Sequence, residues 1–137
     1  MALTPEQKAL AEHRFQRADA TLKEAIDALS GKNFRLTVNR AYYSAFYAMR
    51  AFLATVSKDS SKHSGVVSLF NQHFIKTGIV PEISLKSIQA LMDLRHEGDY
   101  QDFAEINEDE ANGALNSARA IMELLRKKLG ELLKEEE

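Results

Sequence analysis

Arg95 is the residue whose type and position most strongly suggest chemistry. Apolar side chains follow one edge of a helix predicted from Pro81 to His96, and the next step of that three-four pattern lands on Arg95. A guanidinium at the end of a buried stripe is costly unless it meets an acid, backbone carbonyls or a ligand. Arg95 could therefore bind a phosphate with Asp99 and Tyr100 beside it. Alternatively, it pairs with the same two residues only to close the helix onto its neighbours.

A second candidate is one edge of the central predicted helix, which alternates guanidinium and phenol groups. Its members are Arg40, Tyr43, Tyr47 and Arg50. Such an edge can bind phosphates or stack on bases. The simpler alternative is core or interface packing, which we favour for the neighbouring Tyr42 and Phe46, whereas Tyr43 and Tyr47 are the better candidates for contact with a ligand or partner.

Lys62 and His63 lie at a predicted helix start, where backbone N–H groups attract anions. A phosphate could bind there, although a solvated cap with His63 half-buried explains the same residues. His63 and His73 lie ten residues apart, on roughly opposite sides of a helix. No carboxylate–histidine pair has metal-ligand spacing, so we expect neither a metal nor a cofactor.

Helical periodicity and capping signals divide the chain into segments that must position these residues. The predicted helices run from Thr4–Pro5 to Gly31, from Lys32–Phe34 to just before Ser57, from His63 to Thr77–Gly78, from Pro81 to His96, and from Asn107 onward, with a loop over Glu97–Ile106. Short connections favour antiparallel packing of consecutive helices. The expected fold is all-α, an up-and-down antiparallel bundle of four to five helices in a single domain over residues 1–137, with an acidic tail at 134–137 that frays.

Composition limits the classes of function. The 137 residues include no cysteine, which excludes disulfides, thiolate metal sites and thiol nucleophiles, and fits a cytoplasmic location. No apolar run is long enough to span a bilayer, so no membrane association is expected. The 18 basic and 20 acidic residues give a net charge of −2, so no global positive field attracts nucleic acid. No DNA partner is expected, and any contact with RNA or a nucleotide must be local.

Three sequence patterns, in order and at similar spacing, resemble the HEPN family, and more narrowly its small stand-alone prokaryotic members. The patterns are Arg40-Ala41-Tyr42-Tyr43 with Phe46-Tyr47 and Arg50-Ala51, then Ser61-Lys62-His63-Ser64-Gly65-Val66 leading to Phe70 and Phe74, then Leu94-Arg95 with Gly98-Asp99-Tyr100. The resemblance covers roughly Phe15 to Leu125. It implies a helical bundle, commonly a homodimer, often encoded beside a minimal nucleotidyltransferase as toxin and antitoxin.

The resemblance also implies a type of active site. Many family members are metal-independent ribonucleases that use an arginine followed four to six residues later by a histidine, usually assembled across a dimer. The arginine corresponds to Arg95, but the histidine positions hold Tyr100, Gln101 and Asp102. In related toxins a tyrosine two residues beyond the histidine is nucleotidylated by the partner, and that place is Asp102 here.

Three hypotheses follow. The first is an RNA- or nucleotide-associated binding protein, a homodimer working with a nucleotidyltransferase in a toxin–antitoxin type system. The second is a ribonuclease in which Arg95 is the cation and His96, His63 or Tyr100 replaces the missing histidine. Tyr100 makes a poor base at neutral pH, and His96 lies about 100° around the helix from Arg95. The third is a structural bundle without a ligand.

Overall fold

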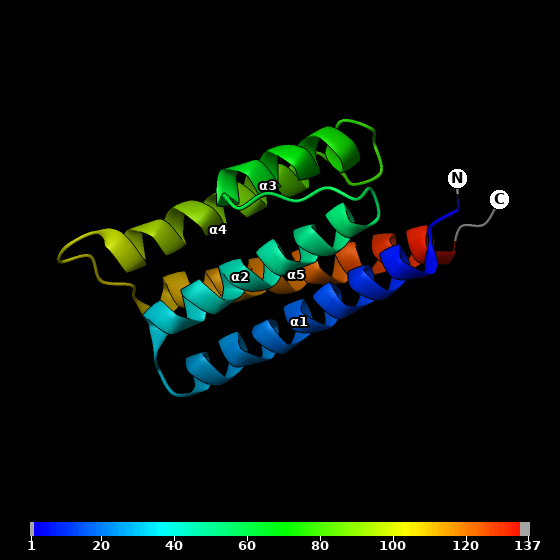
Figure 1. The fold of residues 1–137 in the computed structure, drawn as a ribbon. Helices are drawn as coiled ribbons and strands as arrows, with labels where there is room; N and C mark the ends of the chain where they lie inside the picture. The colour runs from blue at the N-terminus through cyan, green and yellow to red at the C-terminus, as the bar shows by residue number, and fades with distance from the viewer. Residues whose placement is uncertain (1, 135–137) are drawn as a thin grey trace.

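The computed structural model describes residues 2–134, and the described chain contains five α-helices and one short π-helix (Figure 1). The elements are α1 Pro5–Ser30, α2 Phe34–Ala54, α3 His63–Phe70, the π-helix η1 Asn71–Ile75, α4 Ile83–Tyr100 and α5 Glu108–Lys134. The prediction of an all-α helical bundle is confirmed. Within residues 2–134, no helix is sufficiently long and apolar to cross a membrane.

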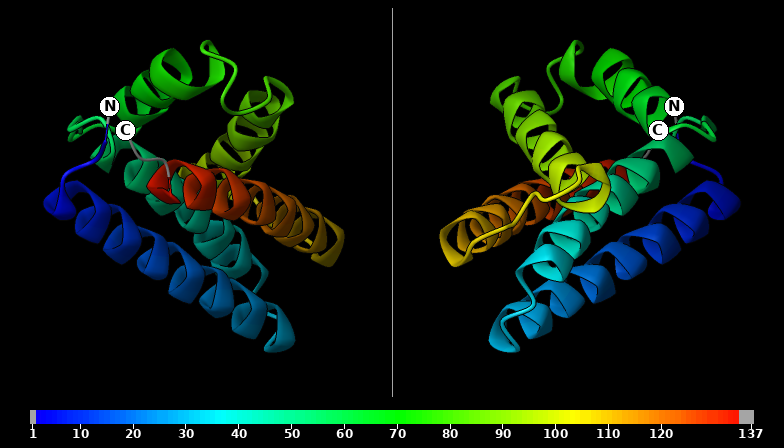
Figure 2. Two further views of the ribbon diagram at one scale, coloured as in Figure 1. Left: turned by 90° about the vertical axis from the view of Figure 1, so that its right-hand side faces the viewer. Right: turned by 90° about the vertical axis from the view of Figure 1, so that its left-hand side faces the viewer.

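The helix α2 is the centre of the bundle and contacts α1, α3, α4 and α5. It lies between α1 on one side and the pair α3 and α4 on the other (Figure 2). Its apolar edge is fully buried at Tyr42, Met49 and Phe52. A second stripe of small residues that includes Ala41 and Ala48 is also fully buried, which permits the close approach of a neighbouring helix.

The predicted start of α1 is confirmed in detail. The Thr4 hydroxyl accepts a hydrogen bond from the Gln7 backbone N–H, and the Gln7 side chain accepts one from the Thr4 N–H. This reciprocal capping box satisfies two donors that a helix start leaves free. The start of α2 at Phe34 is likewise as predicted, with Asn33 as its cap.

The predicted end of the fourth helix was wrong, because α4 continues through Asp99 to Tyr100. Gly98 suggested a loop, but it is buried inside the helix. A Cβ atom there would lie 3.1 Å from the Ile106 side chain. Gly98 therefore permits close packing, and the helical turn that contains it carries Asp99 and Tyr100 on the same rigid element as Arg95.

Two further boundaries also differ from the prediction. The third helix changes to π-helical turns after Phe70, so the segment to Ile75 is not one regular α-helix. Lys134, expected to fray, is the last described residue of α5, and the remainder of the predicted tail lies outside the described residues. These differences leave the candidate site unaffected, because its residues come from α2, α4 and the start of α3.

Candidate functional site

Arg95 is a buried cation whose neutralisation is incomplete. It is 6% exposed, and its Nε has no hydrogen-bond acceptor among the described residues. Its nearest carboxylate, Asp99, lies 3.9 Å from Nη1, and that carboxylate also accepts a hydrogen bond of 2.8 Å from the Asn39 amide. Burying a charge in this way costs free energy unless other groups compensate. The predicted location of Arg95 at the end of a buried stripe is confirmed.

Aromatic rings provide part of the stabilisation that the buried charge of Arg95 does not receive from a close carboxylate. The guanidinium carbon lies 4.8 Å from the ring centre of Tyr42, 5.7 Å from that of Tyr43 and 5.4 Å from that of Tyr100. The ring faces are negatively polarised and attract a cation, but they carry no net charge. The site therefore holds a guanidinium that Asp99 offsets only at a distance, behind an aromatic wall.

His63 completes the cluster from the first residue of α3. Its Nδ1 lies 3.3 Å from Arg95 Nη2 and 3.1 Å from the Tyr42 hydroxyl. Because a guanidinium can only donate hydrogen bonds, Nδ1 must be the acceptor and hence unprotonated. A neutral His63 therefore carries its proton on Nε2, for which no hydrogen bond exists within residues 2–134.

Burial and charge affect the titration of these groups in a consistent direction. Burial lowers the pKa of His63, and the nearby positive charge of Arg95 lowers it further. Burial raises the pKa of Tyr42 to about 12, despite the opposing effect of Arg95. Burial also raises the pKa of Tyr43. At neutral pH, His63 and both phenols are therefore uncharged, and none of them offsets the charge of Arg95.

Tyr100 is the exposed member of the cluster, at 63% exposure. Its hydroxyl accepts a hydrogen bond of 3.3 Å from Arg95 Nη1. A phenol that accepts can still donate its own proton, and that proton has no acceptor in the described part of the chain. Tyr100 and His63 thus each present one donor and are both bonded to the same guanidinium.

His63 also lines an open groove of about 540 Å³, with both polar and apolar surface, between α2 and the loop that precedes α3. The other lining residues are Phe46, Arg50, Asp59, Ser60 and Ser61. The His63 and Phe46 ring centres lie 4.5 Å apart. A ligand in this groove would meet His63 directly, with Arg95 behind it.

On the arginine–tyrosine edge predicted on α2, the Tyr43 and Tyr47 ring centres lie 5.8 Å apart, while the two arginines have acidic partners. Only Tyr43 joins the Arg95 cluster. Arg40 pairs with Glu24 at 3.3 Å and stacks over Tyr43. The Tyr47 hydroxyl accepts a hydrogen bond of 3.1 Å from Arg17, whose guanidinium also lies over the Tyr47 ring.

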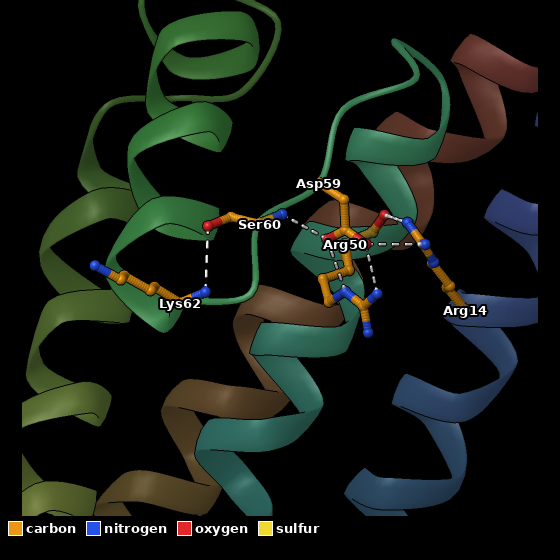
Figure 3. Close-up of polar contacts among 5 residues, drawn as sticks. All are labelled: Arg14, Arg50, Asp59, Ser60 and Lys62. Atoms are coloured by element: carbon orange, nitrogen blue, oxygen red, sulfur yellow. Dashed lines mark hydrogen bonds and ion pairs between the residues drawn. The ribbon is translucent and has the colours of Figure 1, made fainter.

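Three other candidates lie apart from Arg95. Arg50 binds Asp59 at 2.8 Å. Figure 3 shows the Lys62 side chain extending away from Asp59 and Arg50, so its ammonium does not line this part of the site. His96 is exposed, and its ring packs 5.1 Å from the ring centre of Tyr100, with no hydrogen bond to Arg95. Of the residues proposed to replace the histidine of the resembled motif, His63 and Tyr100 contact Arg95 through hydrogen bonds, whereas His96 does not.

Several residues of the site were not predicted from the sequence. Tyr42 was expected to be core, and it is fully buried, but its hydroxyl reaches His63. Asn39 was not singled out although it binds Asp99. Arg14 was not singled out either, although it contacts the backbone carbonyl of Arg50 and the Asp59 carboxylate. The position of Arg14 next to the apolar stripe of α1 was the available signal.

No cluster of three or more His, Asp or Glu side chains with the arrangement of a metal site exists among residues 2–134. What the geometry offers is a positive charge shielded from water, two polarised hydrogen-bond donors and exposed aromatic surface. This combination suits a phosphate group with an attached base or sugar.

Comparison with known proteins adds relatives that align with most of the chain. The sequence model described as "HEPN domain" matches residues 11–129. A protein named "UPF0332 protein" from Thermotoga maritima is 31% identical, with 93% of this chain and 96% of the relative covered. A protein of Methanocaldococcus jannaschii whose name contains the words "Putative toxin" is also 31% identical, over 85% of this chain and 86% of the relative. A "UPF0332 protein" from Gloeobacter violaceus is 40% identical over 72% of this chain and 75% of the relative.

Proposed function

Because the chain belongs to the HEPN domain family, we propose that it binds RNA or ribonucleotides as a component of a toxin–antitoxin type system. A phosphate of the ligand would accept hydrogen bonds from the Nε2–H of His63 and the hydroxyl of Tyr100. Arg95 would act from behind these two groups, as the charge that polarises them. The aromatic rings of Tyr43 and Tyr100 would contact a base or sugar.

The observation that carries this proposal is the incomplete neutralisation of Arg95. A structural arginine at 6% exposure is expected to meet a carboxylate in a close fork. Here the nearest carboxylate is 3.9 Å away and shared with Asn39, while Nε has no partner. An anion bound at the neighbouring donors would supply the missing negative charge in a region of low dielectric, where a charge–charge interaction is stronger than in water.

A toxin role is supported by the names of two relatives from Methanocaldococcus jannaschii, at 31% and 29% identity, which both contain the word "toxin". With that role we propose a nucleotidyltransferase as the protein partner and a homodimer as the working form. Size-exclusion chromatography with light scattering checks the second point. A homodimer gives twice the chain mass of 15.4 kDa, and a single 15.4 kDa species at micromolar concentration would refute it.

The direct test of ligand binding uses a fluorescent single-stranded RNA oligomer in the presence of a chelator. We expect the parent protein to bind it and Arg95→Gln to bind it roughly 10–100-fold more weakly, since hydrogen bonds supported by a charged group contribute about 1.5–3 kcal/mol. The matched control is Arg119→Gln, which removes the same charge from an exposed position on α5. Equal losses in both variants would indicate only a nonspecific charge effect, and no binding by the folded parent would favour a bundle without a ligand.

A ribonuclease is the second candidate, because the 3.3 Å contact between Arg95 and His63 forms an arginine–histidine pair from distant parts of the chain. RNA cleavage without a metal needs a base for the 2′-hydroxyl proton. A neutral His63 with its proton on Nε2 is a donor at that atom, and its only free electron pair, on Nδ1, is occupied by Arg95 and Tyr42. The geometry therefore favours binding over cleavage. Cleavage of the RNA by the parent, abolished in both Arg95→Gln and His63→Gln, would reverse this preference.

A further inference from the structure

Two arginines converge on one carboxylate beside the same groove: Arg50 lines that groove, whereas Arg14 lines a neighbouring pocket that Asp59 also borders. Arg14 from α1 and Arg50 from α2 both point toward Asp59 on the loop between α2 and α3 (Figure 3). Asp59 Oδ2 lies 2.8 Å from Arg50 Nη2 and 3.3 Å from Arg14 Nη2. Asp59 Oδ1 accepts hydrogen bonds from Arg50 Nε at 3.2 Å and from the Ser60 backbone N–H at 2.8 Å. Each carboxylate oxygen therefore has two donors.

The charges of this cluster do not balance. Two guanidiniums face a single carboxylate, so one positive charge remains. The pKa of Arg14 is lowered by burial and by repulsion from Arg50. The arginine side chains are only 17% and 26% exposed, whereas Asp59 is 42% exposed. The two cations are thus fixed on helices, and the anion is the more accessible partner, carried on a loop.

The donors around Asp59 are the kind that a phosphate uses. Arg50 binds the carboxylate as a fork through Nε and Nη2, and planar forks of this type recognise carboxylate and phosphate alike. The backbone N–H of Ser60 and the second guanidinium from Arg14 complete a set of four donors. We call these four donors, from Arg14, Arg50 and Ser60, the anion cradle. The Asp59 carboxylate occupies the cradle, and an oxygen-rich ligand group could replace it there.

The cradle and the Arg95 cluster meet at one groove through His63, the member of that cluster that lines it. Arg50, Asp59 and His63 all line it, and the Phe46 ring lies 4.5 Å from that of His63. Arg50 follows Phe46 by four residues on α2, which places the two side chains next to each other on one helix face. A ligand that extends along the groove from His63 past Phe46 would reach Arg50.

We propose that Arg14 and Arg50 form a second phosphate subsite for an oligoribonucleotide bound at His63 and Arg95, and that Asp59 is an internal competitor which the second phosphate displaces. This proposal rests on the proposed function. It assigns the Asp59 carboxylate a regulatory role, because loss of its charge should favour ligands with two separated phosphates.

The test compares two dinucleotides by isothermal titration calorimetry at low ionic strength. UpU has one phosphate, and pUpU has two that are separated by a nucleoside. We expect the parent to bind pUpU about tenfold or more tightly than UpU. In Arg50→Gln and in Arg14→Gln the ratio of the two affinities should fall toward one, and in Asp59→Asn it should rise several-fold. Arg119→Gln, the matched charge control on α5, should keep the parent's ratio.

The possible failures are distinguishable. If folded parent protein binds neither dinucleotide, both the proposed function and the second subsite are refuted. If it binds UpU and pUpU equally, only the second subsite is refuted. If UDP, whose phosphates share a bridging oxygen, binds as tightly as pUpU, the ligand is not an oligonucleotide that spans two subsites. An unchanged ratio in Asp59→Asn, with melting showing an intact fold, would mean that Asp59 merely fastens the loop.

Discussion

At the scale of single residues, the structure distinguishes Arg95 from other arginines that have an acidic partner. Arg40, Arg50 and Arg126 each approach a carboxylate within 3.3 Å. Arg95 is the most buried of these four and is farthest from its carboxylate. Because a buried charge is costly, an arrangement that leaves Nε without a partner fits a residue kept for a ligand rather than for stability.

This view of Arg95 leads to a stability prediction. Arg95→Met keeps most of the aliphatic volume and removes the buried charge, while Asp99 keeps its hydrogen bond from Asn39. We expect the free energy of unfolding to stay within about 1 kcal/mol of the parent value or to rise. Removal of one partner of a close buried pair would be costly, but Asp99 lies 3.9 Å away and its side chain is 20% exposed, so it is not left buried without a partner. Urea denaturation measures it. A loss of about 3 kcal/mol or more would identify Arg95 as structural.

His63 gives a pH prediction. Its pKa in the folded protein lies below the ordinary value of 6.5, because of burial and then of Arg95. Below pH 6.5 the unfolded chain thus binds more protons at this residue than the folded chain does. The contribution of His63 to stability is therefore complete above pH 6.5 and is lost as the pH falls through the lowered value. Unfolding titrations between pH 7.5 and 4.5 should show a shallower decline for His63→Gln, and parallel curves would contradict the assignment.

At the scale of elements, the loop before α3 fixes the shape of the groove through one glycine. A Cβ atom on Gly65 would lie 2.8 Å from the Ser60 Cβ, much closer than side chains allow. Ser60 also accepts a hydrogen bond from the Lys62 backbone N–H at 3.2 Å. The loop that carries Asp59 and Ser60 therefore packs directly on the first turn of α3, next to His63.

Two glycine substitutions test this packing. Gly65→Ala should reduce the free energy of unfolding by about 1–3 kcal/mol, as expected for overpacking, and shift the backbone amide resonances of Ser60 and Lys62. The matched control is Gly113→Ala in α5, where a Cβ would have no neighbour within 4 Å. It should raise stability by about 0.5–1 kcal/mol through helix propensity. Equal effects of the two substitutions would exclude close packing at Gly65.

The sequence was informative about these elements because helix starts and apolar edges depend on local rules. The Thr4 cap, the start of α2 near Phe34 and the stripe that ends at Arg95 follow from capping chemistry and periodicity. The end of α4 was misplaced because Gly98 looks the same in sequence whether it breaks a helix or packs against Ile106. Only tertiary structure distinguishes the two cases.

The candidate site was predictable only in part for a similar reason. Arg95, Tyr43, Tyr100 and His63 could each be singled out by type and position. That His63 meets Arg95, 32 residues away in sequence, depends on how α3 lies over α2 and α4. The expectation of one arginine–tyrosine edge likewise did not include the partners that neighbouring segments bring to α2. Glu24 pairs with Arg40, Asp59 pairs with Arg50, and the Arg17 guanidinium lies over the Tyr47 ring.

At the scale of the whole molecule, aromatic packing between α2 and the α3–η1 segment forms part of the buried core. The Phe52 ring meets Phe70 and Phe74 edge to face, with centroids 5.4 and 5.1 Å apart, and both Phe52 and Phe70 are fully buried. This cluster anchors the segment that begins at His63 and so holds one wall of the groove.

Removal of that anchor should be costly. Phe52→Ala is expected to reduce the free energy of unfolding by about 3–5 kcal/mol, the range for a large buried ring. The matched control is Phe103→Ala, because Phe103 lies on the loop after α4 and is fully exposed. Chemical denaturation of both variants measures the difference. A similar small change in each would show that α3 is not anchored as described.

The account depends most on a phosphate binding beside Arg95, and NMR measures this directly. UpU is titrated into the protein while the Arg95 side-chain N–H signals and the imidazole signals of His63 are followed, with the exposed Arg119 side chain as the internal reference. The account predicts saturable shifts of the Arg95 and His63 signals at one common affinity and none at Arg119. Binding that leaves the Arg95 and His63 signals unmoved, or shifts only signals elsewhere on the bundle, would contradict it.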